Sequence, residues 1–287
     1  SSRGSTATSF SPMLGSLQSA AELDFRLDER HRTVLSKRRA GGLYHFSKPY
    51  WNGETLALQI VNPTAGLFDG DTMSLDVHLQ KGASVALTSP SASRFYAMDK
   101  SSAKITQSFS LETETWLEYH PNFSVPQQGS EVELETKITL AAGAEMIFLD
   151  QLAPGRVKHG EQYRYRRFTT NLYLHYDGDI HALERMVLEP KLGGWPLSVP
   201  DWEVAFYSAV WIVKDSLDPH CDTLAGIEAS LKKSNLLCGL TQLTEQVAVI
   251  RVLAPRSIIL QKALQEIRAA LNPVFPNHPY NPRLQQV

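Results

Sequence analysis

The sequence predicts a mainly β protein: a layered or β-helical stack of short strands, followed by a small C-terminal α+β segment that carries about two helices. Three observations predict this fold class. Short runs of alternating polar and apolar residues fill residues 43–188, turns recur there at a regular spacing, and helical periodicity is confined to the C-terminal part. We expect three parts: a disordered N-terminal tail over 1–22, a β body over 23–190, and the α+β segment with an extended tail over 191–287.

The N-terminal residues 1–19 are rich in Ser, with Gly and Thr. They lack the basic start and the apolar core of a signal peptide. This composition favours a tail outside the folded body.

Alternation identifies the strands of the β body. Residues 55–60, 73–79 and 131–138 alternate polar and apolar side chains, and in the last run Glu and Lys alternate with Val, Leu and Ile. Such a pattern is typical of a sheet with one buried and one wet face.

A repeated phrase sets the spacing of these strands. Each copy starts with an apolar residue and turns about three residues later, and a Pro follows the next apolar run. The turns fall at positions 53, 82, 114, 143 and 178, and the prolines at 63, 90, 121, 154 and 190. A period of about 30 residues favours stacked rungs, none of which buries its apolar face alone. An ordinary β-sandwich with evenly spaced hairpins is left open with equal weight.

The C-terminal part has a different residue pattern from the β body. Gly and Pro predict a loop over 191–200, and helical spacing predicts helices over 222–234 and 257–271, the second with Ser257 as its N-cap. A strand is expected between them at 246–253. The Pro-rich tail from Asn272 is interpreted either as an extended docking arm or as disordered chain.

Composition excludes several function classes. Lys and Arg total 28 against 30 Asp and Glu, so a net charge of −2 offers no general attraction to nucleic acid or to an anionic membrane. The longest apolar run, 204–213, is about half of the roughly 20 residues that span a bilayer. Two cysteines, Cys221 and Cys238, favour a reducing, cytoplasmic setting, although one bridge between them stays open.

No catalytic motif is present at convincing spacing, so the residues indicate no enzyme. Three polar clusters remain. Residues 62–71 predict a tight turn, whose Asp69 and Asp71 offer oxygen to a cation only with help from other elements. Residues 88–96 combine hydroxyls with Arg and aromatic side chains and suit a partner surface.

The third cluster covers residues 150–161. Its glycines allow a folded-back loop that brings Arg156 near Glu161 as an ion pair. Asp150 ends an apolar strand, so its carboxylate is expected to be partly buried and to need a partner or a water-filled space.

Taken in order, four stretches resemble one family: Asn62-Pro63-Thr64-Ala65-Gly66 with Asp69-Gly70-Asp71, residues 87–96, Leu117-Glu118-Tyr119-His120-Pro121, and Pro154-Gly155-Arg156 with Gly160-Glu161. They look like the urease accessory protein family UreD, called UreH in some bacteria, and the resemblance spans residues 23–283. Two departures are His120, where an apolar residue is commoner, and Leu284-Gln285 after Pro282-Arg283, where many members end in Pro-Arg-x-Trp.

The resemblance implies a nickel chaperone and not an enzyme. It implies a β-helical fold, no tightly bound cofactor, transient Ni²⁺ as cargo, and an internal water-filled route for the ion. The implied partners are a helical UreF-like protein, a UreG-like GTPase and apo-urease, with no nucleic acid and no membrane.

Carried over to this chain, the resemblance implies that Asp71, Asp150 and Glu161 contact the metal in transit. Ser93 would line the route and Arg156 would position the last loop. Structural roles compete for each: turn capping for Asp71, a backbone bond for Ser93, and an ion pair for Glu161 with Arg156. The rival function is a β-rung carbohydrate-binding or hydrolytic protein, with an aromatic groove or two carboxylates about 5 to 9 Å apart.

Overall fold

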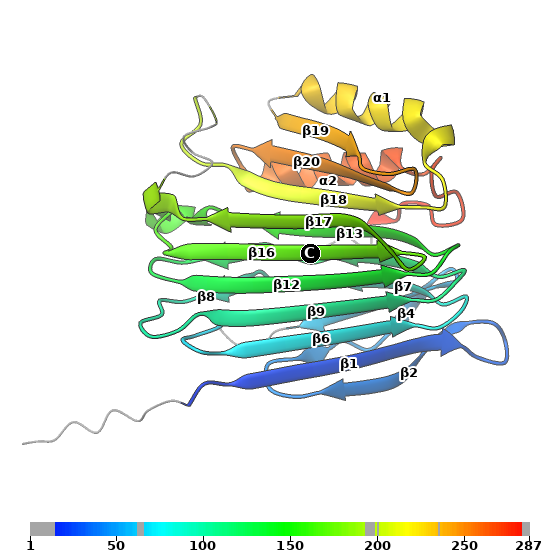
Figure 1. The fold of residues 1–287 in the computed structure, drawn as a ribbon, viewed down its shortest axis with the longest axis horizontal. Helices are drawn as coiled ribbons and strands as arrows, with labels where there is room; N and C mark the ends of the chain where they lie inside the picture. The colour runs from blue at the N-terminus through cyan, green and yellow to red at the C-terminus, as the bar shows by residue number, and fades with distance from the viewer. Residues whose placement is uncertain (1–14, 62–65, 193–198, 200, 235, 283–287) are drawn as a thin grey trace, which may run out of the picture.

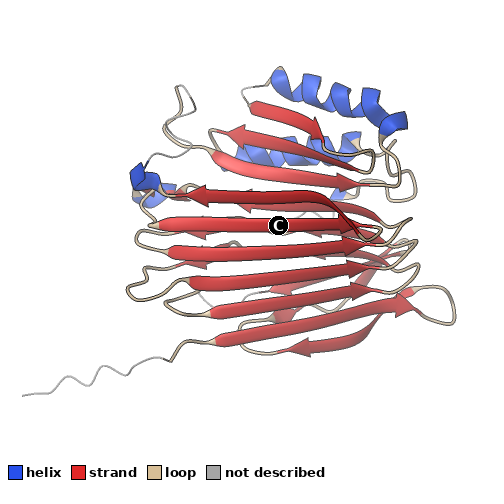
Figure 2. Ribbon diagram, viewed as in Figure 1, coloured by secondary structure: helices blue, strands red, loops and turns tan. Residues whose placement is uncertain are grey.

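The computed structural model describes residues 15–61, 66–192, 199, 201–234 and 236–282. Strands are the commonest regular structure in these residues, and the two α-helices lie at one end of the stack (Figure 2). Within the described residues two large sheets face each other (Figure 1). Sheet I has seven strands in the order β17 (Asp179–Leu188), β16 (Arg167–Tyr176), β12 (Glu131–Leu140), β9 (Ala103–Leu111), β6 (Thr72–Leu79), β1 (Gln18–Leu27) and β2 (Thr33–Ala40).

Sheet II has eleven strands. Its main order is β19 (Leu237–Gln242), β20 (Val247–Ala254), β18 (Phe206–Val213), β13 (Glu145–Leu152), β10 (Trp116–His120), β7 (Ser84–Thr88), β5 (Thr55–Val61) and β3 (His45–Phe46). Strand β4 (Tyr50–Asn52) pairs with β5, while β8 (Ser93–Phe95) and β11 (Ser124–Pro126) pair with each other beside β13. A small hairpin, β14 (Gly155–Arg156) with β15 (Glu161–Gln162), and helices α1 (Cys221–Lys232) and α2 (Ser257–Ala270) complete the fold.

Parallel pairing decides between the two expected architectures. In sheet I the strands β6, β9, β12 and β16 form one parallel ladder, and in sheet II the strands β5, β7, β10 and β13 form another. The chain visits the ladders alternately, which makes a β-solenoid of about four turns. The β-helical prediction is therefore confirmed. A sandwich of hairpins would need antiparallel neighbours in these ladders.

Three of the repeated turns, at Gly82, Glu114 and Gly143, lie where the chain passes from sheet I to sheet II, whereas Gly53 and Gly178 lie in the antiparallel hairpins β4–β5 and β16–β17. All five turn positions have positive φ: Gly53 (59°), Gly82 (77°), Glu114 (61°), Gly143 (79°) and Gly178 (88°). Successive turns also bond to one another, for example Glu112 N to Leu79 O at 2.9 Å and Ala141 N to Leu111 O at 2.9 Å. The period in the sequence is thus the length of one rung.

Three of the prolines mark the opposite corner of the rung, whereas Pro190 follows β17 of sheet I. Pro90, Pro121 and Pro154 follow β7, β10 and β13, where the chain leaves sheet II, and Pro63 lies outside the described residues. There the chain crosses a short third side, formed by β8, β11 and an isolated bridge between Leu67 and Phe95. We call the segments that cross from sheet II to sheet I on this side the corner segments.

The C-terminal segment extends the solenoid. Strand β18 pairs with β13 and with β20, so sheet II runs without a break from the β body into the last third of the chain. One core fills the space between the sheets, and a second lies between the outer face of sheet II and the two helices. None of the helices in the described residues is long and apolar enough to cross a membrane.

Three expectations are corrected at the ends of the chain. Strand β1 begins at Gln18, so residues 18–22 belong to sheet I and not to the tail expected over 1–22; residues 1–14 lie outside the described part. Ser257 is the first residue of α2 and not its N-cap, which is Arg256 without a side-chain cap. Residues 272–281 fold back onto sheet II instead of extending, with Phe275 fully buried and His278 stacked on Trp116 at 4.4 Å.

A buried ion pair joins α2 to the solenoid. Arg268 Nε donates to Glu118 Oε1 at 3.0 Å, and both residues are 4% exposed. The guanidinium also donates to the His278 carbonyl at 2.6 Å and lies over Trp116. Three sequence-distant segments, β10, α2 and the tail, therefore meet at one charge pair.

We predict that Arg268→Met lowers the free energy of unfolding by about 3 kcal/mol, because it leaves the Glu118 carboxylate buried without this cation. The double variant Glu118→Leu/Arg268→Met should recover at least half of that loss. Chemical denaturation of both variants measures this, and losses that simply add would contradict it.

We also predict that Glu114→Gly raises the free energy of unfolding by about 0.5 to 1 kcal/mol, because Glu114 is the non-Gly residue among the five repeated turn positions. Its exposed ion pair with Lys81 contributes little. The reverse change, Gly143→Ala, should destabilise, since φ is 79° and a Cβ would lie 3.2 Å from Thr113 Oγ1. Thermal denaturation of both variants, with opposite signs expected, is the test.

Candidate functional site

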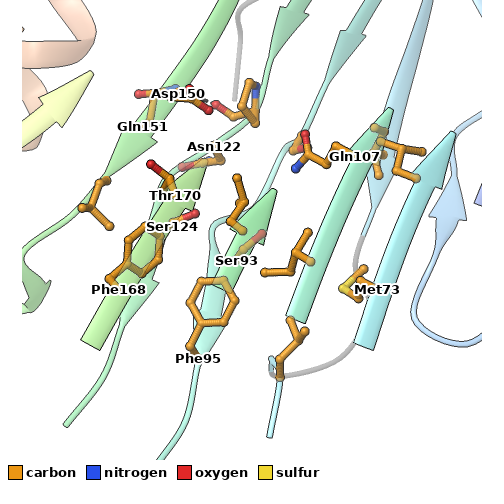
Figure 3. A pocket seen from close by; sticks show the side chains of 18 of the residues that line it. Met73, Ser93, Phe95, Gln107, Asn122, Ser124, Asp150, Gln151, Phe168 and Thr170 are labelled. Atoms are coloured by element: carbon orange, nitrogen blue, oxygen red, sulfur yellow. Dashed lines mark hydrogen bonds between the residues drawn. The ribbon is translucent and has the colours of Figure 1, made fainter. Parts of the chain in front are cut away.

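A cavity of about 110 Å³ lies between the two sheets, next to the corner segments. At roughly 10–15 Å³ for each water position, it has room for several water molecules. Side chains from both sheets and from the corners line it (Figure 3).

One wall of the cavity is polar because the corner segments cross it. Polar side chains of successive rungs face this space: Ser89, Ser91, Ser93, Asn122 and Ser124. Figure 3 shows Asn122, Ser124 and Asp150 turned towards the same space, with Thr170 from β16 opposite them. The remaining wall is apolar, for example at Met73 and Phe168.

Asp150 is the carboxylate at the end of this polar wall. It occupies the inward row of β13, where Met146, Phe148 and Leu152 are buried in the first core. Protein surrounds the Asp150 side chain, yet the residue keeps some accessible surface because it faces the cavity. Burial, with a smaller contribution from the charge of Glu184, raises the pKa of Asp150 to about 7.

Glu184 is a second cavity carboxylate, and the sequence reasoning assigned it no role. It lies on the inward row of β17, among Ala182, Met186 and Leu188, and lines the same cavity as Asp150. Arg251 of β20 pairs with it. The available signal was an acidic residue on the apolar face of an alternating strand.

Ser93 lines the cavity, and its role in a nickel route stays a prediction. It lies on β8 and pairs with Ser124 of β11. Within residues 88–96, Ser89 and Ser93 line the cavity and Phe95 is 1% exposed, whereas Arg94 is exposed, so the partner surface expected at this segment stays a prediction.

Asp71 and the cavity are separate. Its Oδ1 accepts from Leu17 N and its Oδ2 from Phe68 N, each at 2.8 Å, and Asp71 is not among the residues that line the cavity. This is the capping geometry that competed with a metal role. The metal contact of Asp71 stays a prediction.

Glu161 and Arg156 form a two-point ion pair across the β14–β15 hairpin. Arg156 Nε donates to Glu161 Oε2 at 2.9 Å, and Nη2 donates to Oε1. This contact holds the pKa of Glu161 below its ordinary value. Gly155 is required here, because a Cβ would lie 2.4 Å from the Glu161 carbonyl oxygen. Neither charged residue lines the cavity, so their role in the route stays a prediction.

Other candidate ligands lie apart. His120 is 2% exposed, and burial lowers the pKa of its imidazole. Cys221 and Cys238 are free thiols. Within the part of the chain that the structure describes, no three His, Cys, Asp or Glu side chains gather as a metal cluster.

We predict that Asp150→Asn stabilises the chain at neutral and higher pH. The folded-state pKa of Asp150, about 7, lies above its unfolded value, so its contribution to stability is present below about pH 4 and is lost as the pH rises through 7. The variant should gain roughly 2 kcal/mol at pH 8 and almost nothing at pH 4.

Denaturant unfolding at several pH values measures this gain. Asp177→Asn is the matched control, since Asp177 is exposed in a turn at φ 49°, which Asn tolerates. A gain for Asp150→Asn that does not change between pH 4 and pH 8 would contradict the prediction.

Comparisons with known proteins identify the family of this chain. The family profile described as UreD urease accessory protein matches residues 18–286. The protein named urease accessory protein UreD from Opitutus terrae is 34% identical over 88% of this chain and 93% of its own length. Proteins of the same name from Acetivibrio thermocellus and Klebsiella aerogenes are 28% and 25% identical over 84% and 88% of this chain. The chain therefore belongs to the UreD family of urease accessory proteins.

Proposed function

We propose that this chain is a urease maturation factor that holds nickel transiently in the cavity between its sheets and passes it toward apo-urease. One observation carries the proposal: in a member of the UreD family, two carboxylates and a series of hydroxyl and amide groups line a cavity large enough for water. The expectation of a non-enzyme is confirmed by membership in an accessory-protein family.

The lining suits an ion that must leave again. Carboxylate, hydroxyl and amide oxygens bind a borderline divalent cation less tightly than several imidazoles or thiolates would. A series of weak positions favours passage, because an ion must enter readily and still be released. Asp150, Ser93, Ser124 and Asn122 supply such positions.

Proton exchange accompanies metal binding in this proposal. The raised pKa of Asp150 means that its carboxyl is partly protonated near neutral pH. A divalent cation displaces that proton, so binding strengthens as the pH rises through 7. Water in the cavity can take up the released proton.

The remaining assignments extend the route beyond the cavity. Asp71 and Glu161 would contact the ion before or after the cavity, and Arg156 would hold the hairpin that carries Glu161. The partners would be a UreF-like protein, a UreG-like GTPase and apo-urease. The cytoplasm is the proposed site of action, because free thiols such as Cys221 and Cys238 persist in reducing compartments.

The rival function, carbohydrate binding or hydrolysis on a β-rung body, has no support in the comparisons, which match accessory proteins over most of the chain. Asp150 faces a space between the sheets and not a surface groove with exposed aromatic rings. No second function is therefore proposed.

We predict that Asp150→Asn lowers the nickel content and the activity of urease by about tenfold, because the amide cannot supply the negative charge that holds the ion. The measurement is nickel-dependent activation of apo-urease with the purified accessory proteins. Pull-down of the helical partner and of apo-urease by the variant should equal that of the native chain.

Asp177→Asn removes an exposed carboxylate from the same fold and should leave activation unchanged. Normal activation by folded Asp150→Asn would remove Asp150 from the route. Failure of the native chain to bind either partner would contradict the scaffold part of the proposal. Asp71→Asn and Glu161→Gln, in the same assay, decide whether those residues belong to the route.

A further inference from the structure

The cavity has a neighbour on the outside of the solenoid. A cleft of about 650 Å³ lies between β17, the edge strand of sheet I, and the strands β19 and β20 of sheet II. Among the described strands, β17 pairs only with β16, while β18 pairs with β13 and β20. No backbone ladder of the described residues therefore closes the solenoid between β17 and β18 (Figure 1).

Side chains separate the cavity from this cleft. Glu184, Met186 and Tyr207 line both spaces, whereas of the two spaces Asp150 lines the cavity and Arg251 lines the cleft. The charged groups therefore follow one another from inside to outside: Asp150, Glu184 and Arg251. We call this place the side opening.

Arg251 is held at the side opening by three contacts. Its guanidinium pairs with the Glu184 carboxylate and is hydrogen-bonded to the Tyr207 hydroxyl. It also lies 5.7 Å from the centre of the Trp211 ring, and Trp211 is 1% exposed. The Arg251 and Glu184 side chains remain 37% and 22% exposed, so the pair sits at the boundary with solvent.

Charge balance makes Arg251 and a divalent cation competitors. Two carboxylates, Asp150 and Glu184, neutralise one divalent cation completely. A guanidinium that stayed in place would then be a third positive charge beside two negative ones, in a partly desolvated space where like charges repel strongly. The Glu184 carboxylate therefore binds either the Arg251 guanidinium or the divalent metal ion.

We propose that Arg251 is the positioning residue that controls the side opening. Its guanidinium holds Glu184 and closes the opening while the cavity contains no metal, and a divalent cation between Asp150 and Glu184 displaces it and opens a way into the cleft. This inference rests on the proposed nickel function and adds to it an exit and the residue that governs that exit.

The test uses Trp211 as a reporter, because its ring lies under the Arg251 guanidinium. Ni²⁺ is mixed rapidly with the full-length chain, and the rate of Trp211 quenching is taken as the difference between the chain and its Trp211→Phe variant. We expect the rate of saturable Trp211 quenching to be at least fivefold higher in the Arg251→Met variant, which is also measured with and without Trp211→Phe. Arg30→Met, which removes an exposed arginine from the β1–β2 turn, should leave the rate unchanged.

The outcomes separate the two proposals. Equal rates for Arg251→Met and the native chain, with quenching that Asp150→Asn abolishes, overturn the side opening and leave the nickel cavity standing. Absence of saturable quenching in the native chain overturns both. Circular dichroism verifies that each variant is folded, and Arg251→Gln, which keeps a polar side chain of similar reach, replaces Arg251→Met if the latter unfolds.

Discussion

Parallel stacking of rungs is the constraint on which the rest of this structure depends. A single rung exposes an apolar face on each of its strands, and only the next rung covers it. The ladders β6, β9, β12, β16 and β5, β7, β10, β13 satisfy that need, and they force every rung to turn at the same two corners. Positive φ at Gly82, Glu114 and Gly143 is the local consequence at one corner. At the other corner the chain must leave sheet II, and there the ladders are interrupted.

The interrupted corner is where polar groups enter the interior. Main-chain groups outside a ladder need other partners, and the corner segments supply Ser, Asn and Pro there beside apolar side chains such as Phe95. The space between the sheets is therefore not filled by hydrocarbon at this corner. Asp150 and Glu184 extend the polar wall on strands that otherwise face the core with apolar residues. The same stack that gives the protein its stability thus also produces a wet cavity.

Two ion pairs in this molecule differ in how far they are exposed to solvent. Glu118 and Arg268 are sealed between sheet II and α2, and their contacts tie the C-terminal segment to the solenoid. Glu184 and Arg251 are partly exposed at the edge between the sheets, where solvent lowers the free energy required to separate them. A fully buried ion pair suits a structural contact between two segments. A solvent-exposed ion pair suits an exchange in which an arriving metal cation replaces the guanidinium. This contrast is consistent with the proposed role of the interior as a passage for metal.

The sequence by itself determined the rungs, their period, the two helices and the family, because alternation, turn residues and motif order are local properties of the chain. It also indicated Ser93 and Asp150 as residues of an interior route, and both line the cavity. The ion pair of Glu161 with Arg156 was expected from the sequence, whereas only the tertiary structure decided that the rungs stack in parallel and that Asp71 also accepts a hydrogen bond from the distant Leu17. The tertiary structure alone placed Glu184 beside Asp150 and Arg251 between cavity and cleft. These facts depend on which strands become neighbours across the two sheets, and side-chain spacing along one strand carries no information about the residue that faces it from another.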